Sequence, residues 1–531
     1  MCSSDLTRTA MAYTGHGDFT ATSATAEKGI AIAELDRGKA SSPYLQDSYL
    51  RERRRLYDAG VFAAYKLDDR DLLLRRAEFA KARGSLGWLA DREEETPATA
   101  STGAGDRDEA SPQTSGRAVS DLEAEFRALS ARADGDPVAT ARRRTLWARL
   151  MALRARQHGT AALEPFSLAA VQARLGARDA VVYHYWLTPQ TLLIITIDSR
   201  DAVVEKVDLT DSSDDLAGMA AALAALDTEV DWLDSEIPPL GQLLLPRQGA
   251  ALLAGKSRML ISPQGFLHQF PFHAFDWEGE PLISRFAVSY IPNLTTLLAG
   301  RAAPARNAGV FGLAVSRFPA ADPLPGTPAE LAGVAGVYNR TSTNVTTLQE
   351  SAATREHLND LGTSGQLRDY RVLHFATHGE SGSSDDPFSA RLLLADGQVD
   401  GLDISQWALG AELVVLSACQ VGQRAISGRS KAARPDDGQP GEALFGDEMF
   451  GLQAAFFSAG AHEVLGGLWP VGEDTALAIM PALHEHLADG LPCDEALALA
   501  VNAYREQSPS MYKWAPLKLV SVNRPATTSK P

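Results

Sequence analysis

A histidine and a cysteine, each directly after an apolar strand-like segment, are the residues whose types and spacing fit covalent chemistry. His378 follows RVLHFAT, and Cys419 follows ELVVLSA. In α/β sheets, side chains just beyond the carboxyl ends of neighbouring strands meet at one crevice. An imidazole beside a thiol raises the thiolate fraction and later protonates a leaving amine. The pair therefore predicts a dyad with Cys419 as nucleophile and His378 as base.

The glycine after the histidine extends this predicted site. Gly379 has no side chain to obstruct a substrate, so we expect backbone N–H groups near Gly379 and Cys419 to receive the developing oxyanion. His374 lies within the preceding strand-like segment, and this position favours a structural role. The remaining cysteines, Cys2 and Cys493, have no base in a matching context. Such a sparse set without CxxC spacing fits neither a disulfide framework nor a zinc site.

Two adjacent carboxylates follow another apolar segment. Glu473 and Asp474 come after HEVLGGLW, which ends at Trp469. If either one lines a specificity pocket, a basic substrate side chain would be favoured. The alternative is an ordinary helix N-terminus, where acidic residues are common.

The composition describes a globular, multidomain chain. Its 531 residues are 45% hydrophobic and 22% charged, which is enough apolar surface for several cores. The net charge of −17 and the pI of about 5.2 argue against direct binding of the whole protein to nucleic acid. No apolar run is long enough to predict a membrane span or a signal peptide, so we expect a cytoplasmic protein.

The pattern along the chain predicts three parts. Residues 1–43 are small and polar, and we expect a poorly ordered tail. Residues 44–174 show helical periodicity, interrupted by a flexible loop at about 93–117. From residue 175 to about 525, β-branched and aromatic runs alternate with helical segments, which predicts an α/β sandwich with a mostly parallel sheet and helices on both faces. The expected strands are 180–187, 191–197, 258–262, 287–291, 308–315, 371–377, 391–395, 412–418 and 462–469.

Several segments of this second half resemble the CHAT domains, a family related to caspases and separases. The matching stretches are RMLISPQGFLHQFPFHAF, PLPGTPAEL, RVLHFATHGE, ELVVLSACQVG, FGLQAAFFSAGAHEVLGGLWPVGEDTA and KWAPLKL. The histidine precedes the cysteine by 41 positions, from residue 378 to residue 419. In caspases the histidine lies about 50 residues upstream of the cysteine.

The resemblance implies a caspase-like fold, a cytoplasmic cysteine endopeptidase with His378 and Cys419 as its dyad, and a degenerate TPR-like helical region before it. It implies no metal or organic cofactor. The segment Gly428–Gly441 departs from the family pattern and looks like an insertion. We expect residues 426–441 to form a mobile loop near the site, which the enzyme itself could cut at Arg429, Lys431 or Arg434.

Three classes of function compete at this point. The leading prediction is a regulated protease that cleaves specific protein partners, with a regulatory partner bound through the helical region. The second is a catalytically silent CHAT-like scaffold. The third, a nucleotide-binding α/β protein, would need GxxxxGK[ST] or GxGxxG between a strand and a helix, and neither motif occurs in that context.

Overall fold

The chain forms two compact units. The computed structural model describes residues 3–37, 43–81, scattered positions between 121 and 146, then 166–298, 309–341, 343–382, 389–417 and 451–522. The first unit ends at Phe166, and the second begins at Ser167. The predicted loop at 93–117, the predicted loop at 426–441 and Cys419 itself lie outside the described residues.

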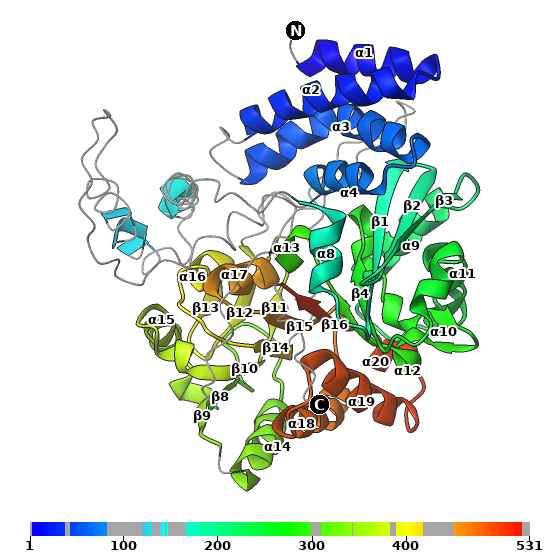
Figure 1. Ribbon diagram of the computed structural model, residues 1–531. Coiled ribbons are helices and arrows are strands. Elements are labelled where there is room, and N and C mark those ends of the chain that lie inside the picture. Colours follow the sequence, from blue (N-terminus) through cyan, green and yellow to red (C-terminus); the bar gives the residue numbers. More distant parts are fainter. Residues whose placement is uncertain are drawn as a thin grey trace, which may run out of the picture. The chain divides into compact units, whose positions relative to one another are not determined.

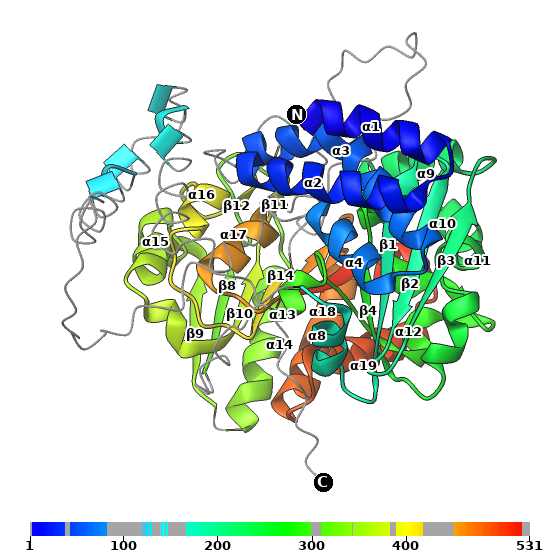
Figure 2. The same cartoon turned by 45° about the horizontal axis from the view of Figure 1, so that its top comes forward.

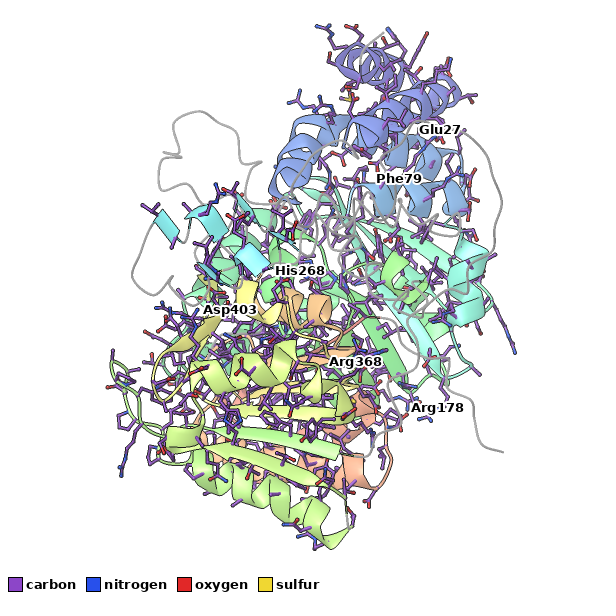
Figure 3. The ribbon with its side chains drawn as sticks, turned by 90° about the vertical axis from the view of Figure 1, so that its left-hand side faces the viewer. Glu27, Phe79, Arg178, His268, Arg368 and Asp403 are labelled. Atoms are coloured by element: carbon purple, nitrogen blue, oxygen red, sulfur yellow. The ribbon has the colours of Figure 1, made fainter. Side chains whose placement is uncertain are left out.

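The described part of the first unit is helical, as the periodicity of the sequence predicts. Its long helices are α1 (Ser3–Gly15), α2 (Phe19–Arg37), α3 (Pro43–Lys66) and α4 (Arg70–Phe79). Helices α1, α2 and α3 lie side by side (Figure 2). The buried Arg76 joins two of the helices, because its guanidinium donates to Glu27 on α2, labelled in Figure 3, at 2.9 Å.

The poorly ordered tail predicted for residues 1–43 is wrong over residues 3–37, which form two helices. Their buried positions are mostly small, for example Ala10, Ala26 and Ala33. Small side chains let helix axes approach closely, and a Cβ on Gly29 of α2 would lie 2.9 Å from Leu56 of α3. Such an interface contains few large apolar residues, so it leaves only a weak periodic signal in the sequence.

The second unit is built on a mixed, mostly parallel sheet of eleven described strands (Figure 1). Their order across the sheet is β3 (Ala202–Asp208), β2 (Thr191–Ile197), β1 (Asp179–Thr188), β4 (Arg258–Ser262), β7 (Ala287–Tyr290), β16 (Leu517–Ser521), β15 (Glu463–Gly467), β14 (Leu413–Ser417), β10 (Tyr370–Ala376), β8 (Gly309–Ala314) and β9 (Val345–Gln349). Only the β1–β2, β2–β3 and β15–β16 pairs in this sheet are antiparallel among the described residues.

Two small sheets accompany the large one. They are β11 (Gly379–Glu380), β12 (Arg391–Leu393) and β13 (Gln398–Asp400), and the hairpin of β5 (Asp276–Trp277) and β6 (Glu280–Pro281). The described α-helices of the second unit are α8 (Leu168–Arg174), α9 (Ser213–Ala224), α10 (Trp232–Glu236), α11 (Gly241–Leu244), α12 (Leu282–Arg285), α13 (Thr295–Leu298), α14 (Thr327–Arg340), α15 (Arg355–Thr363), α16 (Gly401–Ile404), α17 (Leu452–Ala459), α18 (Glu473–Ala488), α19 (Cys493–Arg505) and α20 (Met511–Trp514).

Helices cover both faces of the large sheet (Figure 1). On β10, the His374 ring contacts His484 of α18, whereas the next side chain, Phe375, contacts Phe456 of α17. Because successive residues of a strand point to opposite faces, α17 and α18 lie on opposite sides of the sheet. This arrangement confirms the predicted α/β/α sandwich with a mostly parallel sheet.

Most of the predicted strands are present, and the unit boundary differs slightly. The segment at 391–395 forms β12 of a small sheet, and three strands of the large sheet, β3, β9 and β16, were not predicted. The second unit starts at Ser167 rather than 175, because α8 packs against α13 within it. None of the described helices is long and apolar enough to cross a membrane.

Candidate functional site

The strands that precede His378 and Cys419 in the sequence are neighbours in the sheet. β8, β10, β14 and β15 are consecutive neighbours, and Ala376 of β10 pairs with Ser417 of β14. His378 follows Ala376 by two positions, and Cys419 follows Ser417 by two positions in the sequence. His378 and Cys419 therefore each come two positions after one member of the same paired couple, Ala376 and Ser417.

His378 is held by the segment that follows β8. Its Nε2 lies 2.8 Å from the backbone carbonyl oxygen of Asp322, and its ring lies 4.7 Å from that of Phe318, measured between centroids. A carbonyl only accepts, so Nε2–H is the donor and Nδ1 carries the lone pair in the neutral ring. Such a bond selects the tautomer and the orientation of the imidazole. Nδ1 is then the nitrogen able to take a proton from a thiol.

No side-chain pattern in the sequence indicates this support of His378. The partner of His378 is a backbone carbonyl, so any residue type at position 322 would supply it. Phe318 has no periodic context that marks it as part of a site. The one usable signal was position, because both residues follow an apolar strand that lies next to β10.

Gly379 lies in β11, directly beside the histidine. It is buried and is paired with Leu392 of β12, and Leu393 donates its backbone N–H to the carbonyl of His378 at 2.9 Å. The backbone on the C-terminal side of His378 is therefore held by a second strand. This places Gly379 next to the imidazole.

The two predicted pocket carboxylates have separate partners. Glu473, the first residue of α18, accepts a hydrogen bond from the backbone N–H of Gly326. Asp474 forms an ion pair with Lys513 at 3.1 Å and is the more exposed of the two. Partial burial would raise the pKa of Asp474, but the hydrogen bond from Lys513 holds that pKa below its ordinary value.

His374 lies in a buried polar chain, not at the strand end. Its Nε2 is 2.9 Å from Glu330 of α14, and its Nδ1 is 3.1 Å from Nε2 of His484 on α18. The other nitrogen of His484 is 2.9 Å from the hydroxyl of Tyr338. Burial, and then the neighbouring His374, lower the pKa of His484 well below its ordinary value.

Cys493 has the opposite character to a nucleophile. It is buried at the start of α19. Burial, followed by the negative charges of Glu463 and Glu412, raises the pKa of the Cys493 thiol well above its ordinary value. A thiolate is the reactive form of cysteine, so this side chain stays a protonated, inert thiol at neutral pH. No metal-binding group of three His, Cys, Asp or Glu side chains occurs among the described residues.

The sequence matches the family model of the CHAT domain over residues 234–521, which is more than half of the chain. The match begins in α10 and includes β4 to β16. The three strands β1, β2 and β3 precede it, although they belong to the same sheet. Comparison with curated protein sequences gives no match.

Solved structures resemble the chain at low sequence identity. The separase of the Saccharomyces cerevisiae separase–securin complex has a TM-score of 0.45 and 10% identity, and the match covers 95% of this chain and 37% of that chain. The Arg-specific cysteine proteinase gingipain R has a TM-score of 0.33 and 11% identity, covering 59% and 69%. The Porphyromonas gingivalis RgpB complex of pro- and mature domains has a TM-score of 0.32 and 10% identity, and the match covers 59% of this chain and 71% of that chain. This chain thus spans well under half of the separase chain.

All three TM-scores lie below 0.5, so the fold assignment rests on the sheet order and the family match. The mostly parallel sheet, the helices on both of its faces and the histidine at a strand end define a caspase-like α/β/α sandwich. The chain belongs to the CHAT domain family.

Proposed function

We propose that this chain is a caspase-like cysteine endopeptidase in which His378 and Cys419 form the catalytic dyad. The observation that carries the proposal is the support of His378. Its Nε2–H is committed to the Asp322 carbonyl, which leaves Nδ1 as the base, and its strand is paired with the strand that leads to Cys419. The CHAT family match supports the same reaction class.

The proposed reaction has two steps. His378 Nδ1 takes the proton of the Cys419 thiol, and the thiolate attacks the carbonyl carbon of a peptide bond. Backbone N–H groups near Gly379 and Cys419 stabilise the oxyanion, and the imidazolium protonates the leaving amine. In the second step His378 removes a proton from water, which hydrolyses the thioester and releases the thiol.

Asp474 is the better of the two carboxylates for binding a basic substrate side chain. Its side chain is 65% exposed, and Lys513 already shows that it accepts an ammonium group there. Such a substrate group would displace Lys513. We therefore propose protein substrates with Lys or Arg before the scissile bond. A regulatory protein partner of the helical unit is part of the same proposal, because an intracellular thiol protease needs a means of control.

Cys419→Ala and His378→Ala are each expected to lower peptide cleavage by at least about 1,000-fold, because nucleophile and base act as one unit. Both variants should keep the wild-type circular dichroism spectrum. The measurement is proteomic identification of new protein termini made by the active chain, together with covalent labelling of Cys419 by an electrophilic peptide.

The same experiment decides between the enzyme and a silent scaffold. Cleavage that survives in either purified variant would remove the dyad. If the wild-type chain shows neither labelling nor new termini under any condition, the chain is a scaffold. The residues found before the cleaved bonds test the assignment of Asp474, and a profile without Lys or Arg would contradict it.

A further inference from the structure

The first residue of α18 reaches the segment that supports His378. This segment, residues 316–326, runs from the end of β8 to the N-cap of α14 and carries Phe318 and Asp322. Glu473 accepts a hydrogen bond from the backbone N–H of Gly326, the last residue of the segment. The bond therefore links the N-terminus of α18 to the N-terminus of α14. It also links α18 to the segment that contacts His378, the proposed base.

Other hydrogen bonds hold the two ends of the segment together. Leu324 donates its N–H to the carbonyl of Ser316 at 2.9 Å, and Thr327 Oγ1 donates to the carbonyl of Val315 at 2.9 Å. Between these ties the chain is largely exposed, Asp322 included. Its position relative to His378 therefore depends on how its two ends are anchored.

Glu473 is well suited to anchor the C-terminal end. A carboxylate is favoured at a helix N-terminus, and Gly326 is the N-cap of the fourteen-residue α14. Gly326 has an ordinary helical conformation with φ −76°, so its glycine is not required by the backbone. What it provides is space, because a Cβ at this position would collide with the carboxylate of Glu473.

We propose that Glu473 is a positioning residue for His378. It holds Gly326, and through the segment it holds the Asp322 carbonyl and the Phe318 ring against the imidazole. The proposal rests on the proposed function, in which His378 is the base. It also gives the two carboxylates different roles. Asp474 remains the candidate for substrate contact, whereas Glu473 acts on His378 indirectly, through the segment.

The test compares variants of the full-length chain. Glu473→Ala removes the acceptor, Glu473→Gln keeps one, and Gly326→Ala displaces the carboxylate by adding a methyl group. Glu485→Ala is one matched control, because it removes an exposed ion pair with Arg340 at 2.7 Å between the same two helices. Gly336→Ala is the other, since a Cβ there meets nothing within 4 Å.

Two readouts are measured for each variant. The first is kcat and KM on a peptide identified from the cleaved proteins. The second is the rate at which diethyl pyrocarbonate modifies His378, followed by mass spectrometry of its peptide. The reagent attacks accessible, unprotonated ring nitrogen, so this rate should rise when the bond from Nε2 to Asp322 is lost. It does not depend on proteolytic activity.

Glu473→Ala and Gly326→Ala are expected to lower kcat by about 10- to 100-fold with little change in KM, since small misplacements of a catalytic group cost rates of this size. In both variants, diethyl pyrocarbonate should modify His378 faster than in the wild type. Glu473→Gln should recover most of the kcat lost in Glu473→Ala. The two control variants should match the wild type in kcat and in the rate of modification.

Each contrary outcome is informative. A rise in KM alone, with kcat and His378 modification unchanged, would overturn the proposal and make Glu473 a substrate contact. Equal losses in Glu485→Ala or Gly336→Ala would mean that general helix packing is responsible. If the wild type neither cleaves peptides nor labels at Cys419, the proposed function fails, while the modification rates of His378 still decide whether Glu473 positions it.

Discussion

At the scale of single residues, two histidines four positions apart in the sequence, one within β10 and one beyond its end, have different surroundings. His374 is fully buried, whereas His378 is partly exposed beyond the end of β10. In the buried chain every donor can point the same way: Tyr338 to His484, His484 to His374, and His374 to the carboxylate of Glu330. Such a chain satisfies all of its members, which is the condition for burying polar groups at low cost.

His374→Ala is expected to lower the free energy of unfolding by about 3 kcal/mol or more, because it leaves the carboxylate of Glu330 buried without its donor. Tyr338→Phe removes only the hydroxyl at the far end and should cost about 1–2 kcal/mol. The measurement is urea denaturation. His357→Ala, at an exposed position, is the control and should stay within about 0.5 kcal/mol of wild type.

The same variant separates structure from catalysis. While it remains folded, His374→Ala should retain cleavage, in contrast to His378→Ala. A fully folded His374→Ala protein of wild-type stability that has lost all cleavage would instead assign the base to His374.

At the scale of elements, a glycine on β8 allows α14 to pack closely against the sheet. Gly312 faces Leu331, and a Cβ on Gly312 would collide with that side chain. Beside it, Leu331 packs in a buried cluster with Ala314 of β8 and Ala376 of β10. Small residues on the strands thus let α14 approach the sheet next to the segment that supports His378.

Gly312→Ala is expected to destabilise the chain by about 1–3 kcal/mol through overpacking. Leu331→Ala alone creates a cavity, and the double variant should recover part of the loss, because each change compensates the other. Thermal unfolding of the two single variants and the double variant measures this coupling. Strictly additive effects would show that the two positions do not interact. Gly336→Ala on the same helix is the control without a steric contact.

Elements were predictable where one local pattern dominated. β4, β8, β10 and β14 are short apolar runs that are buried on both faces, and each was expected within a residue or two. The missed strands carry polar residues instead. β9 (VTTLQ) is an edge strand whose threonines are exposed, β3 is the other edge, and β16 contains Lys518. Exposure at a sheet edge and burial of a lysine are properties of the assembled sheet, so the local sequence pattern does not predict these strands.

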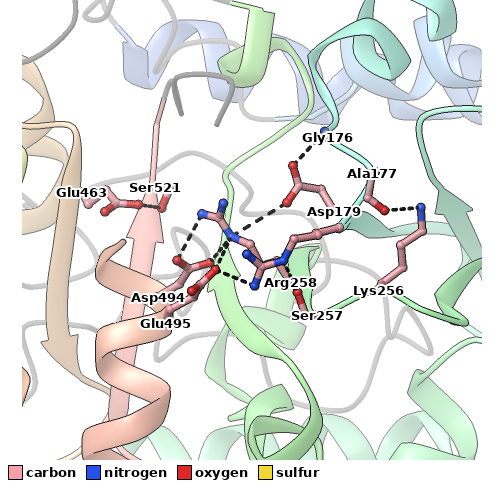
Figure 4. A network of polar contacts seen from close by, with 11 residues as sticks. Gly176, Ala177, Asp179, Lys256, Ser257, Arg258, Glu463, Asp494, Glu495 and Ser521 are labelled. Atoms are coloured by element: carbon pink, nitrogen blue, oxygen red, sulfur yellow. Dashed lines mark hydrogen bonds and ion pairs between the residues drawn. The ribbon is translucent and has the colours of Figure 1, made fainter. Parts of the chain in front are cut away.

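At the scale of the whole second unit, a buried charged cluster lies at the other end of the strands, where β1, β4 and β15 begin (Figure 4). Arg258 donates to both carboxylate oxygens of Asp494, at 3.0 and 3.2 Å. Ser521 donates to Glu463 at 2.6 Å. Burial, and then the charge of Asp494, raise the pKa of Glu463 to about 7.

This cluster predicts a loss of stability as pH rises. In the unfolded chain Glu463 titrates near 4.5, so between that pH and about 7 the folded state holds a proton that the unfolded state has released. The contribution is fully present below pH 4.5 and is lost as pH rises through about 7, and it totals about 3 kcal/mol. Buried His273, with a pKa lowered to about 3 by burial, and buried His484, whose pKa is also lowered, act in the opposite direction until the unfolded imidazoles have released their protons, at about pH 8.

The interval from pH 6.5 to 8 isolates Glu463 when the wild type is compared with Glu463→Gln, because the buried histidines contribute equally to both proteins. Relative to this variant, the wild-type chain should lose about 1 kcal/mol of stability across the interval, since glutamine keeps the bond from Ser521 without titrating. Urea denaturation at several pH values in this interval measures the slope. Equal slopes in the two proteins would show that Glu463 is ionised in the folded chain throughout.

The two compact units predict a specific fragment. A chain that starts at Ser167 keeps α8, which a start at 175 would remove from the second unit. If the helical unit regulates the peptidase, this fragment should be soluble and folded, with altered basal cleavage or a lost response to a partner. If the helices only cover an apolar face, it should aggregate. A folded fragment identical to the full chain in cleavage and partner response would contradict both.

By itself, the sequence predicted helices from residue 44 onward, the α/β second part and the placement of His378 and Cys419 after apolar strands. These properties follow from local periodicity and composition, which act over a few residues. The tertiary structure decided which strands are neighbours, that residues 3–37 are helical, and that a backbone carbonyl at Asp322 holds His378. It also decided that Glu473 meets Gly326, 147 positions away. Contacts of this kind join distant segments through backbone groups that every residue type carries, so the identities of the residues do not encode them locally.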